Sequence, residues 1–558
     1  MKIKSLLIGM LACSAMVACT NTDEPEVNNG EESRGDSYLS VKLVNPTIAS
    51  RAFEDGEGNE SKVANARFYL FDAKGDAYII ADKSENPKNS GKNYVDAPVN
   101  PDYTKNGNVE TLCEAVIVIN KSEKEPPASI VAILNPPTDV LGEANKKLSE
   151  LQHADMAKNY ATYKPENGSI LKPYIGENLF VMTNSVHIDA NNEMLIATPI
   201  AAENIKTSEG EAKAKPVEIF VERIASKVRV KAEGDKINVN ENIVTIPTGI
   251  NDANGKAIIA QIKGWKVTNI TPTSNLIKSL NKTYSFINTN WTIAGWNDAT
   301  NHRSYWANTT ATPEHNWTFN DLTNSANGGV DYYNENTLNT PGSNSQLLVA
   351  AEFLVDGTKT TIAEWYGVKY TLDDLKKAVA GTLTKQIYVK DTEGNLSSIS
   401  KDYIDFVQAS DNETIVEEGR YKSFATYLVK DATGANITYY DAAGKALDGT
   451  TLNSIFANVQ SAKLWAAGGY YFVDIKHHTA NVQTGEGEDA KTEEKNEYAL
   501  VRNHLYDIKI TALSGLGTPV YDPNKIITPE KPKTDLSYIA ARINVLAWKV
   551  VSQNVTLQ

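Results

Sequence analysis

Cysteine is scarce in this sequence, a long apolar stretch is missing, and basic residues form no run beyond the N-terminus. Three Cys in 558 residues supply no disulfide framework, so an exported form would depend on the size of its apolar core. The one apolar segment that concerns a membrane, Leu6 to Ala18, is too short to span a bilayer. The 69 Asp and Glu outnumber the 55 Lys and Arg, and the charge of −14 argues against nucleic acid as a partner.

Motifs of common catalytic and metal sites are missing as well. There is no His-Glu-x-x-His, Cys-x-x-Cys, Gly-x-Ser-x-Gly or P-loop. His477 and His478 are the one adjacent pair among seven His, and neighbours in a strand point to opposite faces, which makes a poor metal site. Because Asp and Glu are plentiful, the sequence does not exclude a pair of carboxylates for glycoside hydrolysis. We expect a protein that is not an enzyme and has no cofactor or metal.

Most of the sequence is typical of β-strands separated by tight turns. Short apolar stretches such as 66–71, 130–134, 217–221 and 470–475 alternate with turn residues. In a type I turn, Asp bonds the backbone ahead of it and Gly accepts the positive φ at the end. The pattern Asp-x-x-Gly recurs between these stretches, at Asp72–Gly75, Asp252–Gly255, Asp391–Gly394, Asp431–Gly434 and Asp441–Gly444. None has the further acidic residues of a calcium loop, so we predict hairpins.

Helices should be few and short, which predicts an all-β fold. Helical spacing occurs at Leu141–Leu151, Ser274–Leu280, Leu372–Ala380 and Leu452–Lys463, and Thr371 with Asp374 resembles a capping box. These helices would cover or connect β-sandwiches.

A polar, charged stretch at 203–213 precedes Pro216 and a new run of strands, so we place a domain boundary near residue 215.

Residues 281–345 have an unusual composition. They contain 14 Asn and four of the eight Trp, namely Trp291, Trp296, Trp306 and Trp317. Aromatic rings among Asn, Thr and Gly can stack on sugars, so an adhesive surface is one interpretation. We favour a long loop insertion in which the Trp side chains pin irregular backbone onto the domain.

The N-terminus predicts export as a lipoprotein. Lys2 and Lys4 precede the apolar segment, as in a secretory signal. Met16-Val17-Ala18-Cys19 resembles the lipobox of bacterial lipoproteins, whose Cys is acylated, with Met16 where Leu is usual. Cys13 is a second candidate, and a plain cleaved signal peptide is the alternative.

If Cys19 is lipidated, Cys113 stands alone, and its strand-like surroundings predict a buried structural thiol.

Similar amphipathic strands are predicted near the two ends of the sequence that follows the signal segment. Near the start, Leu39, Val41 and Leu43 alternate with polar residues, and Arg51-Ala52 follows in an open, Gly-rich polar stretch of the kind that proteases cut. Near the end, after a Pro-rich stretch, the apolar residues are Ile539, Ala541, Ile543, Val545, Trp548 and Val550. The chain thus has a first strand it could lose and a last strand that could replace it in another copy. Such donor-strand exchange is a form of β-augmentation, and head-to-tail repetition gives a filament.

These features lead to a family resemblance that covers nearly the whole chain. The most specific piece is VRNHLYDIKI at 501–510, followed by GLGTP at 515–519. Further pieces in the family's order are FVMTNS at 180–185, VERIASKV at 221–228, GW at 264–265 and NVLAWKVV at 544–551. The chain resembles the fimbrillins of type V pili, in particular the major subunit of the short, or minor, fimbriae.

The resemblance implies a fold and a maturation path. The fold would be two transthyretin-like β-sandwiches in tandem. The precursor would be a lipoprotein, acylated (palmitate) at Cys19 and carried to the outer membrane. An arginine-specific protease would then cut between Arg51 and Ala52, with Arg34 the runner-up, and the last strand of another copy would fill the groove.

The implied organisation has five parts. Residues 1–19 would be the lipoprotein signal and acylation site, 20–51 the propeptide, 52–215 and 216–535 the two sandwiches, and 536–558 the donor strand segment. Partners would be copies of the same chain, the protease, and anchor and tip subunits of a surface fimbrium that serves adhesion and colonisation. A tip or anchor subunit of the same fimbria, and a monomeric glycan-binding surface lipoprotein, are the alternative functions.

Overall fold

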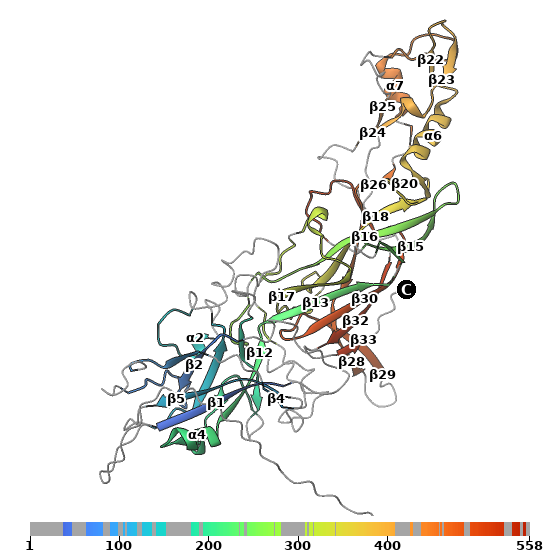
Figure 1. Cartoon of the computed structure of the whole chain (residues 1–558). Helices are drawn as coiled ribbons and strands as arrows, with labels where there is room; N and C mark the ends of the chain where they lie inside the picture. Colours follow the sequence, from blue (N-terminus) through green and yellow to red (C-terminus); the bar gives the residue numbers. More distant parts are fainter. Residues whose placement is uncertain are drawn as a thin grey trace, which may run out of the picture.

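The structure is a computed structural model. It describes residues 37–46, 63–81, 90–98, 104–106, 109–119, 125–136, 141–151, 180–188, 193–233, 235–238, 243–272, 274–280, 307–309, 312–315, 317–340, 342–407, 425–427, 437–456, 458–459, 462–484, 491–528, 538–546 and 551–553. Strands dominate these residues and the helices are short, so the expected all-β class is confirmed (Figure 1).

The N-terminal part is built on one ten-stranded sheet. Its main path runs β3 (Tyr94–Pro98), β2 (Asn65–Phe71), β6 (Ser129–Leu134), β7 (Met182–Asn184), β12 (Val217–Arg223), β1 (Ser37–Pro46), β5 (Val109–Ile119) and β4 (Thr104–Asn106). Two short strands join it, β10 (Thr198–Pro199) beside β6 and β11 (Ile205–Lys206) beside β1. The sheet surrounds one apolar core that includes Phe68, Ile130 and Ile219.

The C-terminal part is a β-sandwich of two sheets. One has the order β17 (Asn327–Asn334), β13 (Ala225–Ala232), β30 (Leu505–Ser514), β32 (Tyr538–Leu546) and β33 (Val551–Gln553). The other has β14 (Asp235–Asn238), β15 (Ile243–Asn251), β16 (Ala257–Thr268), β18 (Gln346–Val355), β27 (Gly468–Asp474) and β31 (Thr518–Val520), with β19 (Thr358–Lys359) beside β18. Residues of both sheets, such as Val230 and Val349, share one core.

A small module is inserted between β18 and β27, which are neighbours in the second sheet. It contains β20 (Ile362–Trp365), β21 (Val368–Thr371), α6 (Leu372–Leu383), β22 (Tyr388–Lys390), β23 (Leu396–Ser398), η7 (Lys401–Tyr403), β24 (Asp405–Val407), β25 (Ala425–Tyr427), α7 (Gly449–Phe456) and β26 (Lys463–Trp465). The module has its own apolar core and forms one end of the molecule (Figure 1). Its entry and exit lie together, since Thr361 Oγ1 donates to the Ala466 carbonyl at 3.3 Å.

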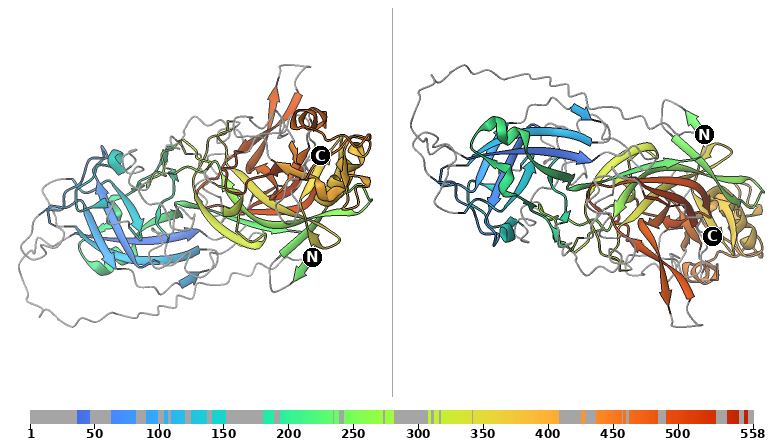
Figure 2. Two further views of the ribbon diagram at one scale, coloured as in Figure 1. Left: turned by 90° about the horizontal axis from the view of Figure 1, so that it is seen from above. Right: turned by 90° about the horizontal axis from the view of Figure 1, so that it is seen from below.

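Smaller elements complete the described chain. They are α2 (Leu148–Leu151), β8 (His187–Ile188), β9 (Met194–Leu195), η4 (Ala202–Asn204), α4 (Glu209–Ala214), η6 (Phe319–Asp321), β28 (Lys476–Thr484) and β29 (Lys491–Tyr498). The β28–β29 hairpin projects from the body (Figure 2).

The Asp-x-x-Gly turns are confirmed at the four copies that the structure describes. The Gly amide donates to the Asp carbonyl at 3.0 Å in Asp72–Gly75, 2.9 Å in Asp252–Gly255, 3.1 Å in Asp391–Gly394 and 3.0 Å in Asp441–Gly444. These Gly residues have φ between +79° and +87°, in the left-handed region that suits Gly. Asp431–Gly434 lies outside the described residues.

The predicted helices were partly right. The helix from Leu372 is confirmed as α6, and the Thr371 hydroxyl caps it by accepting from the Asp374 amide at 3.2 Å. Within the expected Leu141–Leu151 helix only α2 is a regular helix, and α7 replaces Leu452–Lys463, whose end enters β26.

The helix expected at Ser274–Leu280 is wrong. Leu276, Ile277 and Lys278 follow one another and all three are buried, which the single apolar face of a surface helix does not allow. The carbonyls of Asn275 and Leu276 instead accept hydrogen bonds from Arg502.

Part of the Asn- and Trp-rich region is an integral part of the sandwich. Trp317 Nε1 donates to the Val267 carbonyl at 2.6 Å, and Phe319 and Leu322 are buried. For Trp317 this agrees with a side chain that pins a loop. Trp291, Trp296 and Trp306 lie outside the described residues.

The two parts meet where β12 continues into β13 with only Ile224 between them. β12 pairs with β1 and β7 of the first sheet, and β13 pairs with β17 and β30 of the sandwich. By sheet membership the change therefore falls at Ile224, after the predicted boundary near residue 215.

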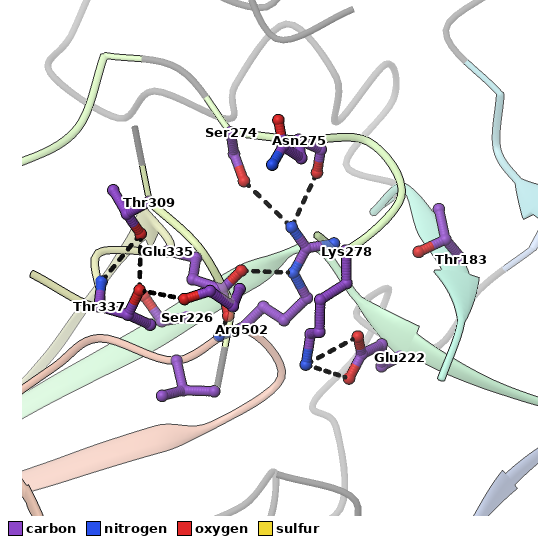
Figure 3. Close-up of polar contacts among 12 residues, drawn as sticks. Thr183, Glu222, Ser226, Ser274, Asn275, Lys278, Thr309, Glu335, Thr337 and Arg502 are labelled. Carbon is purple, nitrogen blue, oxygen red and sulfur yellow. Dashed lines mark hydrogen bonds and ion pairs between the residues drawn. The ribbon is translucent and has the colours of Figure 1, made fainter. Parts of the chain in front are cut away.

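Buried charged side chains connect the two parts at this point (Figure 3). Glu222 of β12 forms an ion pair with Lys278 at 3.1 Å, and Glu335, just after β17, pairs with Arg502 at 3.0 Å. All four side chains are 4% exposed or less. Arg502 also donates to the carbonyl of Asn275 at 2.8 Å and of Leu276 at 3.2 Å. Burial raises the pKa of Glu222, and the positive charge of Lys278 opposes that rise.

We expect Arg502→Met to destabilise the protein strongly. The change would leave the Glu335 carboxylate buried without its cation, and breaking a buried pair in this way costs about 3–5 kcal/mol. The free energy of unfolding in urea measures the loss. Lys256→Met is the matched control, because it breaks a pair with Asp356 in which both side chains are at least half exposed, and it should leave stability nearly unchanged. Equal effects of the two variants would contradict the role given to Arg502.

Burial of His504 should make the junction sensitive to acid. The His504 Nδ1 donates to the Arg502 carbonyl at 2.8 Å, and burial lowers the pKa of His504 from 6.5 to about 4. Between pH 6.5 and about 4, the His504 side chain is protonated in the unfolded chain and stays neutral in the folded chain. Stability is therefore complete above pH 6.5 and falls as the pH drops, by up to about 3 kcal/mol.

The variant His504→Gln isolates this contribution. The difference in unfolding free energy between the variant and the parent should shift in favour of the variant as the pH is lowered from 7.5 to 5. A difference that stays constant over this range would show that His504 is not the titrating group.

Candidate functional site

The first strand occupies an interior position in its sheet. β1 is antiparallel to β5 over its whole length, from the Ser37–Ile119 pair to the Pro46–Val109 pair. Its other edge is parallel to β12 from Val41–Val217 to Val44–Phe220, and antiparallel to β11 at Tyr38 and Leu39. β1 is the dark blue strand in Figure 1. Both of its hydrogen-bonding edges are thus in use.

The side chains of β1 that the structure describes agree with the predicted alternation. Leu39 and Val41 are 0% exposed and belong to the core with Ile117 and Ile219. Ser40, between them, points to the opposite face and is also buried, at 2% exposed. The side chain of Leu43 lies outside the described part.

Loss of β1 would therefore open a complete slot. The slot would have β5 on one side, β12 and β11 on the other, and the apolar core as its floor. Unpaired backbone groups at two facing edges are a strong template for another strand. Such a slot accepts a strand whose alternate side chains are apolar.

The last strand is paired within its own chain. β32 is antiparallel to β30 from Leu505–Leu546 to Ser514–Tyr538, and β33 pairs with its other edge. The predicted donor residues Ile539, Ala541, Ile543 and Val545 all lie in β32, so a strand at this position is confirmed. Trp548 and Val550 lie outside the described residues.

One continuous segment, β12 followed by β13, connects the sheet that contains β1 with the sheet that contains β32. β12 pairs with β1, and β13, which follows it, pairs with β30, the partner of β32. The charged junction in Figure 3 fixes the point where this segment passes from one sheet to the other. The sequence had not revealed β12 as a neighbour of β1, because parallel partners far apart in the chain leave no local pattern.

The charged junction was also missed, although two of its residues, Glu222 and Arg502, lie in the family-like pieces 221–228 and 501–510. A signal was present, since Glu222-Arg223 and Arg502 interrupt apolar strand sequences in which charge is costly unless paired. Cys19, Arg51 and Ala52 lie outside the described residues, so lipidation and cleavage remain predictions. Cys113 is in β5, as its strand-like surroundings had indicated.

Two kinds of feature are absent from the residues that the structure describes. In these parts of the chain, His, Cys, Asp and Glu side chains form no group of three or more that could hold a metal ion. The described helices include none with the length and apolar character needed to cross a membrane.

We expect Leu39→Ala to lower the stability of the uncut chain by about 2–5 kcal/mol, as for other fully buried Leu side chains. The urea midpoint of the precursor measures this. Val368→Ala is the control, because Val368 is 41% exposed and its truncation should change little. If Leu39→Ala matched the control, β1 would not be part of the core.

Comparison with known proteins gives one match in sequence and several in structure. Residues 466–554, which include β30 and β32, match the family model described as "Major fimbrial subunit protein type IV, Fimbrillin, C-terminal". No curated protein matches the chain.

The matches among solved structures have low identity and low TM-scores. A fimbrilin (fimA) from Porphyromonas gingivalis W83 has 12% identity over 92% of this chain and 99% of its own, with a TM-score of 0.36. The tip fimbrial protein Mfa3 from Porphyromonas gingivalis has 12% identity over 91% of this chain and 100% of its own, with a TM-score of 0.27. The sequence match covers residues 466–554, and this region of the chain is similar to the C-terminal part of fimbrillins.

Proposed function

We propose that this chain is a structural subunit of a cell-surface fimbrium, joined to other copies by exchange of β1 for the C-terminal strand of a neighbour. The fimbrillin match at 466–554 supports the fimbrial role. The interior position of β1 carries the exchange, because a strand with partners on both edges leaves a slot of matching shape when it departs. The chain would build a filament that serves adhesion and colonisation, and would catalyse no reaction.

The maturation path extends this proposal. The precursor is exported as a lipoprotein through Cys19 and reaches the outer membrane, and an arginine-specific protease cuts it between Arg51 and Ala52. Loss of residues 1–51 leaves 558 − 51 = 507 residues and removes the lipid anchor. The cut follows β1, so it ends the covalent link between this strand and the rest of the chain.

The precursor would be protected against early assembly at both ends. β1 fills the slot that a neighbour needs, and β32 pairs with β30 of its own sheet, so no donor strand is free. Cleavage makes the departure of β1 irreversible because the strand is no longer tethered. Natural β-proteins cover open edges in this manner to avoid uncontrolled association.

The finished joint should exchange slowly. Burial of five or six apolar side chains, at roughly 1.5–3 kcal/mol each, gives about 8–18 kcal/mol per joint before the cost of ordering. Backbone hydrogen bonds to the facing edges of β5 and β12 add geometric specificity.

The first test is cleavage of the unlipidated precursor, residues 20–558, with an arginine-specific protease. We expect a new N-terminus at Ala52 and a ladder of polymers on an unboiled denaturing gel. Arg51→Ala should abolish both results, whereas Arg34→Ala, at the runner-up site, should change neither. A product that is cut at Ala52 and stays monomeric would favour a tip or anchor subunit, or a glycan-binding surface lipoprotein.

The second test concerns the donor strand. The double variant Ile543→Asp, Val545→Asp should give a folded, cleavable monomer that cannot donate its strand, because two carboxylates would have to enter the apolar slot. Asn544→Asp adds a carboxylate to the same strand at the alternate position and should still polymerise. Normal fibres from the double variant would refute the assignment of this strand as the donor.

A further inference from the structure

The segment from η4 to the end of α4, residues 202–215, lies over β1 and takes part in holding it. The chain runs along β1 as β11, pairing Ile205 with Leu39 and Lys206 with Tyr38. It then forms α4 and returns along the same edge of β1 as β12, starting at the Val217–Val41 pair. β11 and β12 pair with the same edge of β1 and run in opposite directions, and α4 lies in the connection between them.

Helix α4 covers the outer face of β1. It contacts both β1 and β5, and Figure 1 shows it next to β1. Its buried residue is Ala212, at 0% exposed, and Ser40 is buried although it points away from the core. A small residue on each side is what the close approach of a helix to a strand requires. β1 is thus enclosed on its inner face, its outer face and both edges.

Asn204 closes this segment on itself. Its side-chain amide donates to the carbonyl of Lys215 at 3.2 Å, and its Oδ1 accepts from the Ala201 amide at 2.9 Å. Lys215 also pairs with Glu203 at 3.0 Å, in an exposed position. These contacts join the beginning of the segment to its end, so it holds its shape around the strand beneath.

We propose that residues 202–215 form a clasp that grips whichever strand occupies the slot and admits only a small residue at the position of Ser40. This inference rests on the proposed function and deepens it. The clasp closes on β1 in the precursor and on the strand of a neighbouring copy in the filament. It must open for one strand to replace the other.

The clasp also selects the register of the incoming strand. In β1 the enclosed triplet is Leu39-Ser40-Val41, with two apolar side chains in the core and a small buried one on the opposite face, while α4 contacts the same strand. The alternate positions of β32 between its apolar residues are Ala540, Arg542 and Asn544, and of these only Ala540 is small. Ile539-Ala540-Ala541 is therefore the triplet that takes the place of Leu39-Ser40-Val41.

The test measures release and uptake of strands by the protease-cut precursor, residues 20–558. Release of the cut first strand is followed by gel filtration in the presence of a fluorescent synthetic peptide of residues 536–553, whose uptake is read at the same time. Asn204→Ala should release the strand about three- to tenfold faster, since one side-chain hydrogen bond network is lost. Gly210→Ala should slow release about two- to fivefold, because Ala stabilises α4 and a Cβ at this Gly meets nothing within 4 Å.

Peptide variants test the register. A peptide with Ala540→Leu should be taken up at least about tenfold less well, because the added side chain would press against α4. A peptide with Asn544→Leu carries an equally large apolar residue beyond the enclosed triplet and should enter like the parent. If both peptides enter equally well, or if the three proteins release the strand at equal rates, the clasp is overturned.

The outcomes separate this inference from the proposed function. If release responds to Asn204→Ala and Gly210→Ala while no peptide enters, the grip on β1 stands and the donor assignment fails. If peptides enter without preference while filaments form normally, strand exchange stands and the selective clasp fails.

Discussion

A strand in the interior of a sheet must satisfy hydrogen bonds along both edges, and this requirement on β1 organises the N-terminal part of the molecule. β5 serves one edge over its whole length, while β12 and β11 divide the other. The core closes only when Leu39 and Val41 are present, since both are fully buried. The chain therefore depends on residues at its own beginning for a complete sheet, and any strand that replaces them must meet the same two edges and the same floor.

The charged junction gives this arrangement a fixed orientation toward the sandwich. Glu222 belongs to the strand that borders β1, and Arg502 immediately precedes β30, the strand that pairs with β32. Buried ion pairs add little to stability compared with apolar packing, but a single buried charge without its partner is costly, so they tolerate few alternative arrangements. The two strand-bearing parts are consequently held together at this point.

The sequence allowed a good prediction of what is local. Alternation identified β1 at Leu39 and Val41, Asp-x-x-Gly identified four described hairpin turns, and Thr371 identified the start of α6. It failed where tertiary contacts override local preference, as at Leu276 to Lys278, whose side chains are all drawn inward. It could not reveal that β12 lies parallel to β1, that α4 contacts β1, or that Glu335 and Arg502 meet, because these partners are remote in the chain and each has an ordinary local sequence.

The inserted module gives one end of the molecule a surface that is separate from the two main sheets. It enters and leaves the sandwich through the paired strands β20 and β26 and folds around its own core. Its surface can therefore change without disturbing the strands that hold the chain together. In a polymer, each copy would present this surface once per repeat, and many weak contacts at fixed spacing become strong by avidity.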